Sequence, residues 1–269
     1  MKTNNRRPIG VFDSGVGGLT VARSMRQHLP EEDIIYFGDT ARVPYGNKSR
    51  PTIIRFSGEI MTFLMKHKVK MVVVACNTAS SFSLPFLSRN YPLPVIGVIR
   101  PGVREAVRLT ENGRIGVIGT SATISSGSYA KELARVSRDC RLFPQSCPLF
   151  VPLVENGLVD DPVTYEMAGR YLNDLKANGV DTLILGCTHY PLLKEVIGDV
   201  VGHGVNLVDS SYVVAKEVLA VLEKNGLKAP ERKKAGTMEC FVSDDREGFR
   251  KLARMIMGED VDVEKVAFS

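Results

Sequence analysis

Short, nearly continuous apolar runs alternate along the chain with longer amphipathic segments. The apolar runs are Ile9–Phe12, Ile34–Phe37, Met71–Ala75, Val95–Val98, Ile115–Ile118, Thr182–Leu185 and Val205–Val208. Runs that lack strict alternation are typical of parallel strands covered on both faces. The segments between them carry apolar residues at helical spacing, as in Leu19, Ala22, Met25 and Leu29. The alternation predicts βαβ units and an α/β fold with doubly wound parallel sheet.

The C-terminal stretch follows a weaker version of the same pattern. Between Met238 and Phe268 we expect a strand, a helix that begins after Asp244-Asp245, and a final short strand. The preceding segment, from Lys224 to Lys234, is locally basic and predicts a solvated loop.

The two halves of the chain repeat each other loosely. In each half an early strand ends in small polar residues and a later strand ends in a cysteine. The separation is 106 residues from Phe12 to Ile118, at the ends of the early strands, and 111 residues from Cys76 to Cys187. Because these two offsets are similar, we expect a duplicated unit.

The composition is that of an ordinary globular protein and excludes several classes. The 269 residues are 44% hydrophobic and 24% charged, with a formal net charge of +5. No apolar run approaches the roughly 18–20 residues of a membrane span, and the basic residues lack the clustering that nucleic-acid binding needs. We therefore expect no membrane and no nucleic-acid partner.

The N-terminus and the cysteines indicate where the protein is located. The polar N-terminus from Met1 to Pro8 leads into no apolar signal core, and the five cysteines lack disulfide-scaffold spacing. We therefore expect a cytoplasmic protein with reduced thiols.

Ligands of open α/β sheets bind at the carboxyl ends of the strands. The residues that follow the predicted strands are Asp13-Ser14-Gly15, Gly38-Asp39-Thr40, Cys76-Asn77-Thr78, Gly119-Thr120, Gly186-Cys187-Thr188-His189 and Asp209-Ser210-Ser211. The glycine-rich turn from Asp13 to Gly18 can present backbone N–H groups to a carboxylate or a phosphate. Its spacing is neither that of the dinucleotide fingerprint nor that of a P-loop, so nothing indicates a nucleotide cofactor.

Cys76 and Cys187 differ from the other cysteines, because each follows a central strand and has a threonine within the next two residues. A thiol at a helix N-terminus is stabilised as the thiolate by the helix dipole and by free N–H groups. His189, two residues after Cys187, could orient or charge-balance that thiol. The remaining cysteines are interpreted as small hydrophobic residues; they are Cys140, Cys147 and Cys240.

Most cysteine chemistries do not fit this pattern. A zinc site would need a C-x-x-C pair or further histidines, and a redox pair would need the C-x-x-C motif, so we expect no metal. Nucleophilic hydrolysis would leave one thiol unexplained, and a phosphatase loop would need an arginine after the cysteine. Two opposed thiols fit proton transfer at a stereocentre, where one removes a proton from one face and the other delivers a proton to the opposite face. Sulfurs placed in this way are roughly 7 Å apart and stay reduced.

Six motifs run in order from residue 10 to about residue 193. They are Gly10–Val21, Tyr36–Thr40, Pro44–Ser49, Ala75–Ser80, Val154–Gly157 and Gly186–Leu193. By these motifs the sequence resembles the glutamate racemase family, within the cofactor-independent amino-acid racemase superfamily. The tail beyond Lys224 carries no motif.

The resemblance implies a role for each matching residue. Cys76 and Cys187 would be the two proton donors and acceptors. Glu155 and His189 would tune Cys187, and Asp13 would pair with the substrate ammonium or assist Cys76. The implied substrate-binding residues are Asp13, Ser14, Tyr45, Gly46, Asn77, Thr78, Thr120, Thr123, Thr188 and His189.

The resemblance also implies an architecture and a biological setting. We expect two similar doubly wound parallel-sheet lobes related by a pseudo-two-fold axis, with the active site between them. The first would comprise residues 1–98 and 209–269, and the second residues 99–208. The substrate would be glutamate, used without pyridoxal phosphate, metal or nucleotide, and the D-glutamate would supply peptidoglycan synthesis in a bacterial cytoplasm. Homodimers are common in the family. The alternatives are a racemase of another acid such as aspartate, and a non-catalytic dicarboxylate-binding protein.

Overall fold

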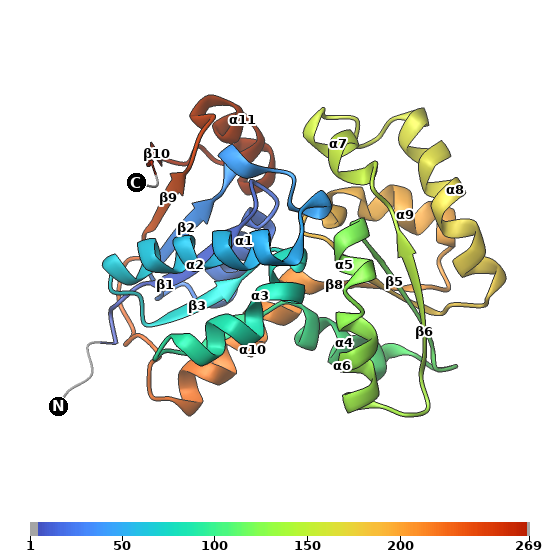
Figure 1. Cartoon of the computed structure of the whole chain (residues 1–269), viewed down its shortest axis with the longest axis horizontal. Helices are drawn as coiled ribbons and strands as arrows, with labels where there is room; N and C mark the ends of the chain where they lie inside the picture. Colours follow the sequence, from blue (N-terminus) through green and yellow to red (C-terminus); the bar gives the residue numbers. More distant parts are fainter. Residues whose placement is uncertain (1–4, 268–269) are drawn as a thin grey trace. The chain divides into compact units, whose positions relative to one another are not determined.

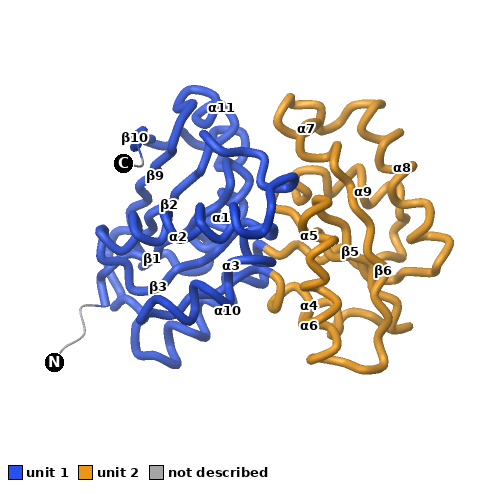
Figure 2. The backbone as a smooth tube through the Cα atoms, in the orientation of Figure 1, with its two compact units in different colours: residues 1–98, 211–269 blue, residues 99–210 orange. Residues whose placement is uncertain are grey.

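The chain forms two compact units, each with its own parallel sheet (Figures 1 and 2). The computed structural model describes residues 5–267, so Phe268, at the end of the predicted C-terminal stretch, and residues 1–4 of the predicted N-terminal segment lie outside the described residues. Unit 1 comprises residues 1–98 and 211–269, and unit 2 comprises residues 99–210. The chain therefore enters unit 2 after Val98 and returns to unit 1 after Ser210.

Unit 1 contains a six-stranded sheet in the order β10-β9-β2-β1-β3-β4, in which every pairing is parallel. Its strands are β1 (Ile9–Asp13), β2 (Ile34–Gly38), β3 (Met71–Val74), β4 (Val95–Gly97), β9 (Met238–Val242) and β10 (Val263–Lys265). The first three strands are completely buried, as expected for parallel strands with both faces covered.

Helices cover the sheet of unit 1 on both faces. They are α1 (Leu19–His28), α2 (Arg50–Lys66), α3 (Asn77–Asn90), α10 (Ser210–Lys224, whose first residue belongs to unit 2) and α11 (Arg246–Met257), with the 3₁₀ turns η1 (Thr40–Arg42) and η2 (Tyr45–Asn47). Phe12 and Val74 pack with Ile60 of α2 in one apolar cluster. On the other face, the Tyr36 ring contacts Phe249 of α11, which itself packs against α1. The alternation of side chains along each strand thus supplies both cores.

Unit 2 contains a four-stranded parallel sheet in the order β6-β5-β7-β8. Its strands are β5 (Arg114–Gly119), β6 (Arg141–Ser146), β7 (Thr182–Gly186) and β8 (Asn206–Asp209). Its helices are α4 (Ile99–Leu109), α5 (Ser121–Ser125), α6 (Ser128–Val136), α7 (Phe150–Glu155), α8 (Pro162–Ala177) and α9 (Lys194–Val201), with the 3₁₀ turn η3 (Tyr190–Leu193). Ile118 and Leu183 pack with Leu172 of α8 in the main apolar cluster.

The same order of four strands recurs in the two sheets. In unit 1 it is β2-β1-β3-β4, and in unit 2 it is β6-β5-β7-β8. This places β1 in correspondence with β5, and β3 with β7. Cys76 follows β3 and Cys187 follows β7, so each unit has a cysteine after the equivalent strand. The recurrence supports the duplication that the sequence offsets indicate.

The seven predicted strands are all present, each within one residue of its predicted ends. The C-terminal strand, helix and strand are also confirmed as β9, α11 and β10. Strand β6 is absent from the predicted strands, because it is an edge strand that mixes polar residues with Pro144 and a single buried side chain, Phe143. Proline is tolerated at a sheet edge, where one side of the strand needs no hydrogen-bond partner. Within residues 5–267, no helix is both long enough and apolar enough to span a membrane.

Candidate active site

The glycine-rich loop after β1 buries a carboxylate. The Asp13 side chain is completely buried, and its Oδ2 accepts a hydrogen bond from the N–H of Gly15 at 3.0 Å. The Tyr36 hydroxyl donates to the carbonyl of Gly15 at 2.8 Å, and burial together with Asp13 raises the pKa of this tyrosine well above its usual value. A Cβ atom at Gly18 would lie 2.5 Å from Cβ of Asp13 and 2.9 Å from the Tyr36 hydroxyl. The packing therefore requires glycine at position 18.

Cys76 caps the N-terminus of α3. Its sulfur accepts a hydrogen bond from the N–H of Ala79 at 3.5 Å, and it lies 3.7 Å from the hydroxyl oxygen of Ser14. The residue is 5% exposed. A helix N-terminus favours negative charge, so the position suits a thiolate. Asn77 and Thr78 form the buried first turn of the same helix.

The segment after β2 that contains η1 and η2, residues 40–47, is called the Tyr45 turn here. Two of its side chains are hydrogen-bonded to the buried carboxylate of Asp39, directly after β2. Asp39 is completely buried and accepts hydrogen bonds from the Tyr45 hydroxyl, from Nε of Arg42 at 2.7 Å and from the Ser243 hydroxyl at 2.8 Å. Burial and the neighbouring Asp39 raise the pKa of Tyr45. The Tyr45 side chain is thus directed into unit 1, and Gly46 follows it in η2.

Cys187, His189 and Glu155 form a chain of contacts in unit 2. The Cys187 sulfur lies 3.8 Å from Nδ1 of His189, and Nε2 of the same ring lies 3.2 Å from Oε1 of Glu155. Cys187 is 8% exposed and His189 is 5% exposed, whereas the Glu155 side chain is 36% exposed. A histidine in this position can connect a thiol with a carboxylate.

Hydroxyl groups lie near the carboxyl ends of β5 and β7 in unit 2. Thr120 caps α5 by accepting a hydrogen bond from the N–H of Thr123 at 3.3 Å, and the two hydroxyl oxygens are 3.0 Å apart. Thr123 and Thr188 are buried. These side chains can donate to a carboxylate as well as to one another.

The predicted site residues therefore fall into two groups. Unit 1 carries Asp13, Ser14, Tyr45, Gly46, Cys76, Asn77 and Thr78, and unit 2 carries Thr120, Thr123, Glu155, Cys187, Thr188 and His189. Each group gathers at or near the carboxyl ends of its own strands, which is where parallel sheets bind ligands. Within residues 5–267, no group of three or more His, Cys, Asp or Glu side chains forms a metal-binding cluster.

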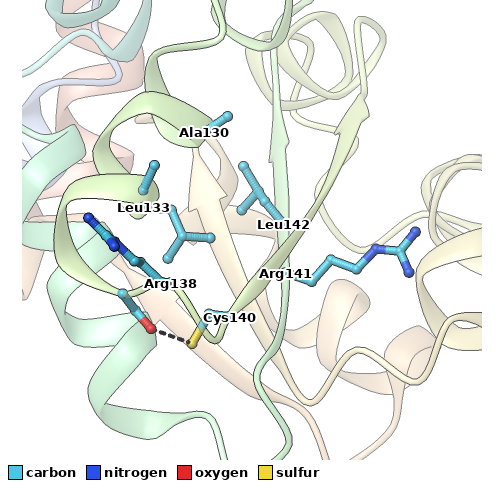
Figure 3. Close-up of a pocket in the computed structure, with 8 residues that line it drawn as sticks. Ala130, Leu133, Arg138, Cys140, Arg141 and Leu142 are labelled. Atoms are coloured by element: carbon cyan, nitrogen blue, oxygen red, sulfur yellow. Dashed lines mark hydrogen bonds between the residues drawn. The ribbon is translucent and has the colours of Figure 1, made fainter.

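The other three cysteines lie in different surroundings. Cys147 is completely buried, and burial together with its neighbour Cys187 raises its pKa. Cys240 lies in β9, where burial raises its pKa to about 12. Cys140 is partly buried and lines a pocket of about 500 Å³ between α6 and β6 (Figure 3). None of the predicted site residues lines that pocket.

Asp39 and the three side chains that donate to it, Arg42, Tyr45 and Ser243, form what we call the Asp39 cluster. Two of its residues were not predicted from the sequence. Arg42 and Ser243 both donate to the Asp39 carboxylate, and Ser243 is 204 residues away along the chain. Arg42 could have been noticed, since it lies between two motifs. Ser243 carries no local signal, because only the pairing of β9 with β2 brings it to this place.

Comparison with known proteins gives one consistent result over nearly the whole chain. A family model described as Asp/Glu/Hydantoin racemase matches residues 9–218. A glutamate racemase of Persephonella marina is 49% identical over 97% of this chain and 97% of its own. The crystal structure of glutamate racemase from Thermus thermophilus in complex with β-chloro-D-alanine is 48% identical, with a TM-score of 0.89 over 98% of both chains. The glutamate racemase of Francisella tularensis in complex with D-glutamate is 37% identical, with a TM-score of 0.91 over 98% of both chains.

Proposed function

Because this chain belongs to the Asp/Glu/hydantoin racemase family and is an amino-acid racemase, we propose that it interconverts L- and D-glutamate through two cysteine thiols. The observation that carries the proposal is the equivalence of the two cysteines. Cys76 and Cys187 follow corresponding strands, β3 and β7, in two sheets with the same strand order. A duplicated fold that supplies one acid–base group per unit suits a reaction that needs two such groups.

The proposed reaction transfers two protons, one from the substrate to a sulfur and one from a sulfur to the substrate, and nothing is oxidised or reduced. One cysteine, as the thiolate, takes the α-proton of glutamate and becomes a thiol. The other cysteine, as the thiol, delivers its proton to the opposite face of the α-carbon and becomes a thiolate. The product has the inverted configuration, and the two sulfurs have exchanged protonation states. Conversion in the reverse direction uses the same two groups with their roles exchanged.

Each cysteine has neighbours that suit this role. Around Cys76, the N-terminus of α3 favours the thiolate, and the Ser14 hydroxyl lies beside the sulfur. Around Cys187, we propose that His189 orients the thiol and compensates its charge, with Glu155 holding the ring. No pyridoxal phosphate, metal or nucleotide enters the proposed mechanism.

The binding groups suit an acidic amino acid. We propose that Asn77, Thr78 and Thr188 donate to the substrate carboxylates, together with Thr120 and Thr123. Asp13, a buried carboxylate in the loop after β1, would receive the ammonium group. Since the Tyr45 hydroxyl already binds Asp39, the turn Tyr45-Gly46 would act through its backbone amides, which stand at the start of a 3₁₀ helix.

The proposed setting follows from the family. D-glutamate produced by this chain would supply peptidoglycan synthesis in the bacterial cytoplasm. Growth of a D-glutamate auxotroph that expresses the chain, on medium without D-glutamate, tests this part of the proposal.

The decisive experiment measures the incorporation of solvent deuterium. The protein is incubated in D2O with L-glutamate, and separately with D-glutamate, and both enantiomers are separated early in the reaction and analysed by mass spectrometry. Two-thiol transfer predicts deuterium at the α-carbon of the product and protium in the remaining substrate, in both directions. Turnover of aspartate in preference to glutamate would assign the other acid as substrate. Binding of glutamate without any exchange would contradict catalysis.

A further inference from the structure

The Asp39 cluster connects the segment after β2 with the residue after β9, about two hundred residues later, and through the Asp39 backbone with the loop after β1. Arg42 and Tyr45 belong to the turn after β2, and Ser243 immediately follows β9. The carboxylate of Asp39 accepts from all three side chains. The N–H of Asp39 also donates to the carbonyl of Asp13 at 3.1 Å. The cluster thus links the loop after β1 with the Tyr45 turn.

Ser243 is placed between the carboxylate and the backbone of the turn. Its hydroxyl donates to Oδ1 of Asp39 at 2.8 Å and accepts from the N–H of Ala41 at 2.9 Å. Its own N–H donates to the carbonyl of Gly38 at 3.2 Å. One hydroxyl therefore contacts both the Asp39 carboxylate and the backbone that leads to Tyr45.

Asp244, next to Ser243, adds a second pair of hydrogen bonds between the segment after β9 and the segment after β2. The hydroxyl of Thr40 donates to the carbonyl of Asp244, and the N–H of Asp244 donates back to that hydroxyl at 2.8 Å. The register of β9 on β2, with Val242 opposite Gly38, brings these pairs together. Two consecutive residues of the C-terminal segment are therefore fastened to the first two residues of the turn.

We infer that Ser243 is a positioning residue for substrate binding, acting through Asp39 on the Tyr45-Gly46 turn. The inference rests on the proposed function of that turn. It assigns a role in the reaction to the C-terminal segment, which lies beyond residue 218, where the family model ends. Loss of the hydroxyl leaves the carboxylate of Asp39 with two side-chain donors and removes the acceptor of the Ala41 N–H in η1. The turn then spends less time in the conformation that binds glutamate.

A matched control lies at the other end of the same strand pair. The Thr237 hydroxyl, just before β9, donates to Oδ1 of Asp33, just before β2, at 2.9 Å. This is again a hydroxyl on an aspartate between the same two segments, but at the amino end of the strands. Replacement of Thr237 removes one side-chain hydrogen bond between the segments that flank β9 and β2, away from the Tyr45 turn. Replacement of Ser243 removes the bond to Asp39 and the acceptor of the Ala41 N–H.

The experiment compares Ser243→Ala, Ser243→Thr and Thr237→Ala with the unmodified chain in steady-state racemisation of glutamate and in thermal unfolding. We expect Ser243→Ala to raise KM by about tenfold with kcat within about twofold, since a binding contact common to ground state and transition state is lost. Ser243→Thr keeps the hydroxyl and should restore KM to within about twofold. Thr237→Ala should leave both constants unchanged, whatever the change of its Tm.

Two results would overturn the inference. One is an unchanged KM in Ser243→Ala, and the other is an equal change of KM in Ser243→Ala and Thr237→Ala, which would indicate a structural role alone. Failure of the proposed function is distinguishable, because the unmodified chain would then not racemise glutamate at all.

Discussion

The Nδ1 atom of His189 lies 3.8 Å from the sulfur of Cys187. On the other side of the ring, Nε2 faces Glu155 at 3.2 Å. A neutral imidazole that donates from Nε2 to the carboxylate has Nδ1 as an acceptor for the thiol proton. We therefore propose that the Glu155 side chain acts on Cys187 through the tautomer of His189, without touching the sulfur.

Replacement of His189 should therefore reduce turnover more than replacement of Glu155. We expect His189→Asn to lower kcat by about tenfold to a hundredfold, because an acid–base partner of the thiol is lost. Glu155→Gln keeps an acceptor oxygen and should cost less than about tenfold. Measurement of kcat and KM in both directions checks this order, and equal effects of the two substitutions would contradict it.

The two central cysteines should be individually essential for inversion. We expect Cys76→Ser and Cys187→Ser each to lower racemisation by about a hundredfold or more, since serine is a much weaker acid than cysteine. Each variant should still exchange the α-proton of one enantiomer with D2O, and the two variants should differ in which enantiomer exchanges. Cys140→Ser, which changes a thiol away from the candidate site, is the control and should retain full activity. Inversion at the normal rate in either central variant would exclude the two-thiol mechanism.

The packing at Gly18 predicts a large effect of one added methyl group. A Cβ atom there would meet Asp13 and the Tyr36 hydroxyl, both buried. We expect Gly18→Ala to reduce kcat/KM by more than about tenfold and to destabilise the protein by about 1–3 kcal/mol, as overpacking does. Gly58→Ala is the control, since it lies inside α2 and its Cβ would meet only Phe86, at 3.7 Å. That variant should be neutral or more stable by up to about 1 kcal/mol in urea unfolding.

The buried ion pair of unit 1 predicts a rescue by double substitution. Lys70 lies 2.5 Å from the Glu32 carboxylate, both side chains are at most 2% exposed, and burial lowers the pKa of Lys70. Glu32→Gln removes the carboxylate that pairs with the buried ammonium group of Lys70, and it should lower the free energy of unfolding by about 3 kcal/mol. Glu32→Gln combined with Lys70→Met removes the stranded charge and should recover at least half of this loss. A double variant no more stable than the single one would refute the argument.

We expect the Asp181 carboxylate to make a pH-dependent contribution to the free energy of unfolding. Burial opposes the shift, but hydrogen bonds from Thr110 and from the N–H groups of Asn112 and Glu111 hold its pKa below 3.8. A depressed pKa stabilises the folded state above the unfolded pKa of about 3.9, and this contribution disappears as the pH falls through the folded value.

We therefore expect Asp181→Asn to lose about 2 kcal/mol at pH 7 in urea unfolding, since a charged acceptor of three hydrogen bonds is lost. The difference from the unmodified chain should stay constant between pH 7 and pH 5 and shrink below about pH 4. A difference that grows on acidification would contradict the assignment.

The strands that carry the candidate chemistry were predictable because both of their faces are buried. Ile9–Asp13 and Thr182–Gly186 are buried throughout and consist mostly of apolar residues, so their positions and the polar residues at and after their ends can be read from the sequence. Strand β6 was missed because an edge strand is under no such constraint. The repeat would have predicted it, since β2 of unit 1 needs a counterpart next to β5.

The contacts of the candidate site were less predictable than its residues. The motifs contain Tyr45, but nothing in them indicates that its hydroxyl binds Asp39 inside unit 1. Ser243 reaches Asp39 only through the register of two strands more than two hundred residues apart. Such contacts follow from chain topology, which short motifs do not encode.

The return of the chain to unit 1 has a consequence for the order of events during synthesis. Unit 2 is one continuous segment, whereas β2 of unit 1 pairs with β9, whose residues are synthesised only after the whole of unit 2. Until they emerge, β2 is an open edge that can pair with another nascent chain. Unit 2 can thus fold first, and the sheet of unit 1 is completed only when β9 has emerged and paired with β2.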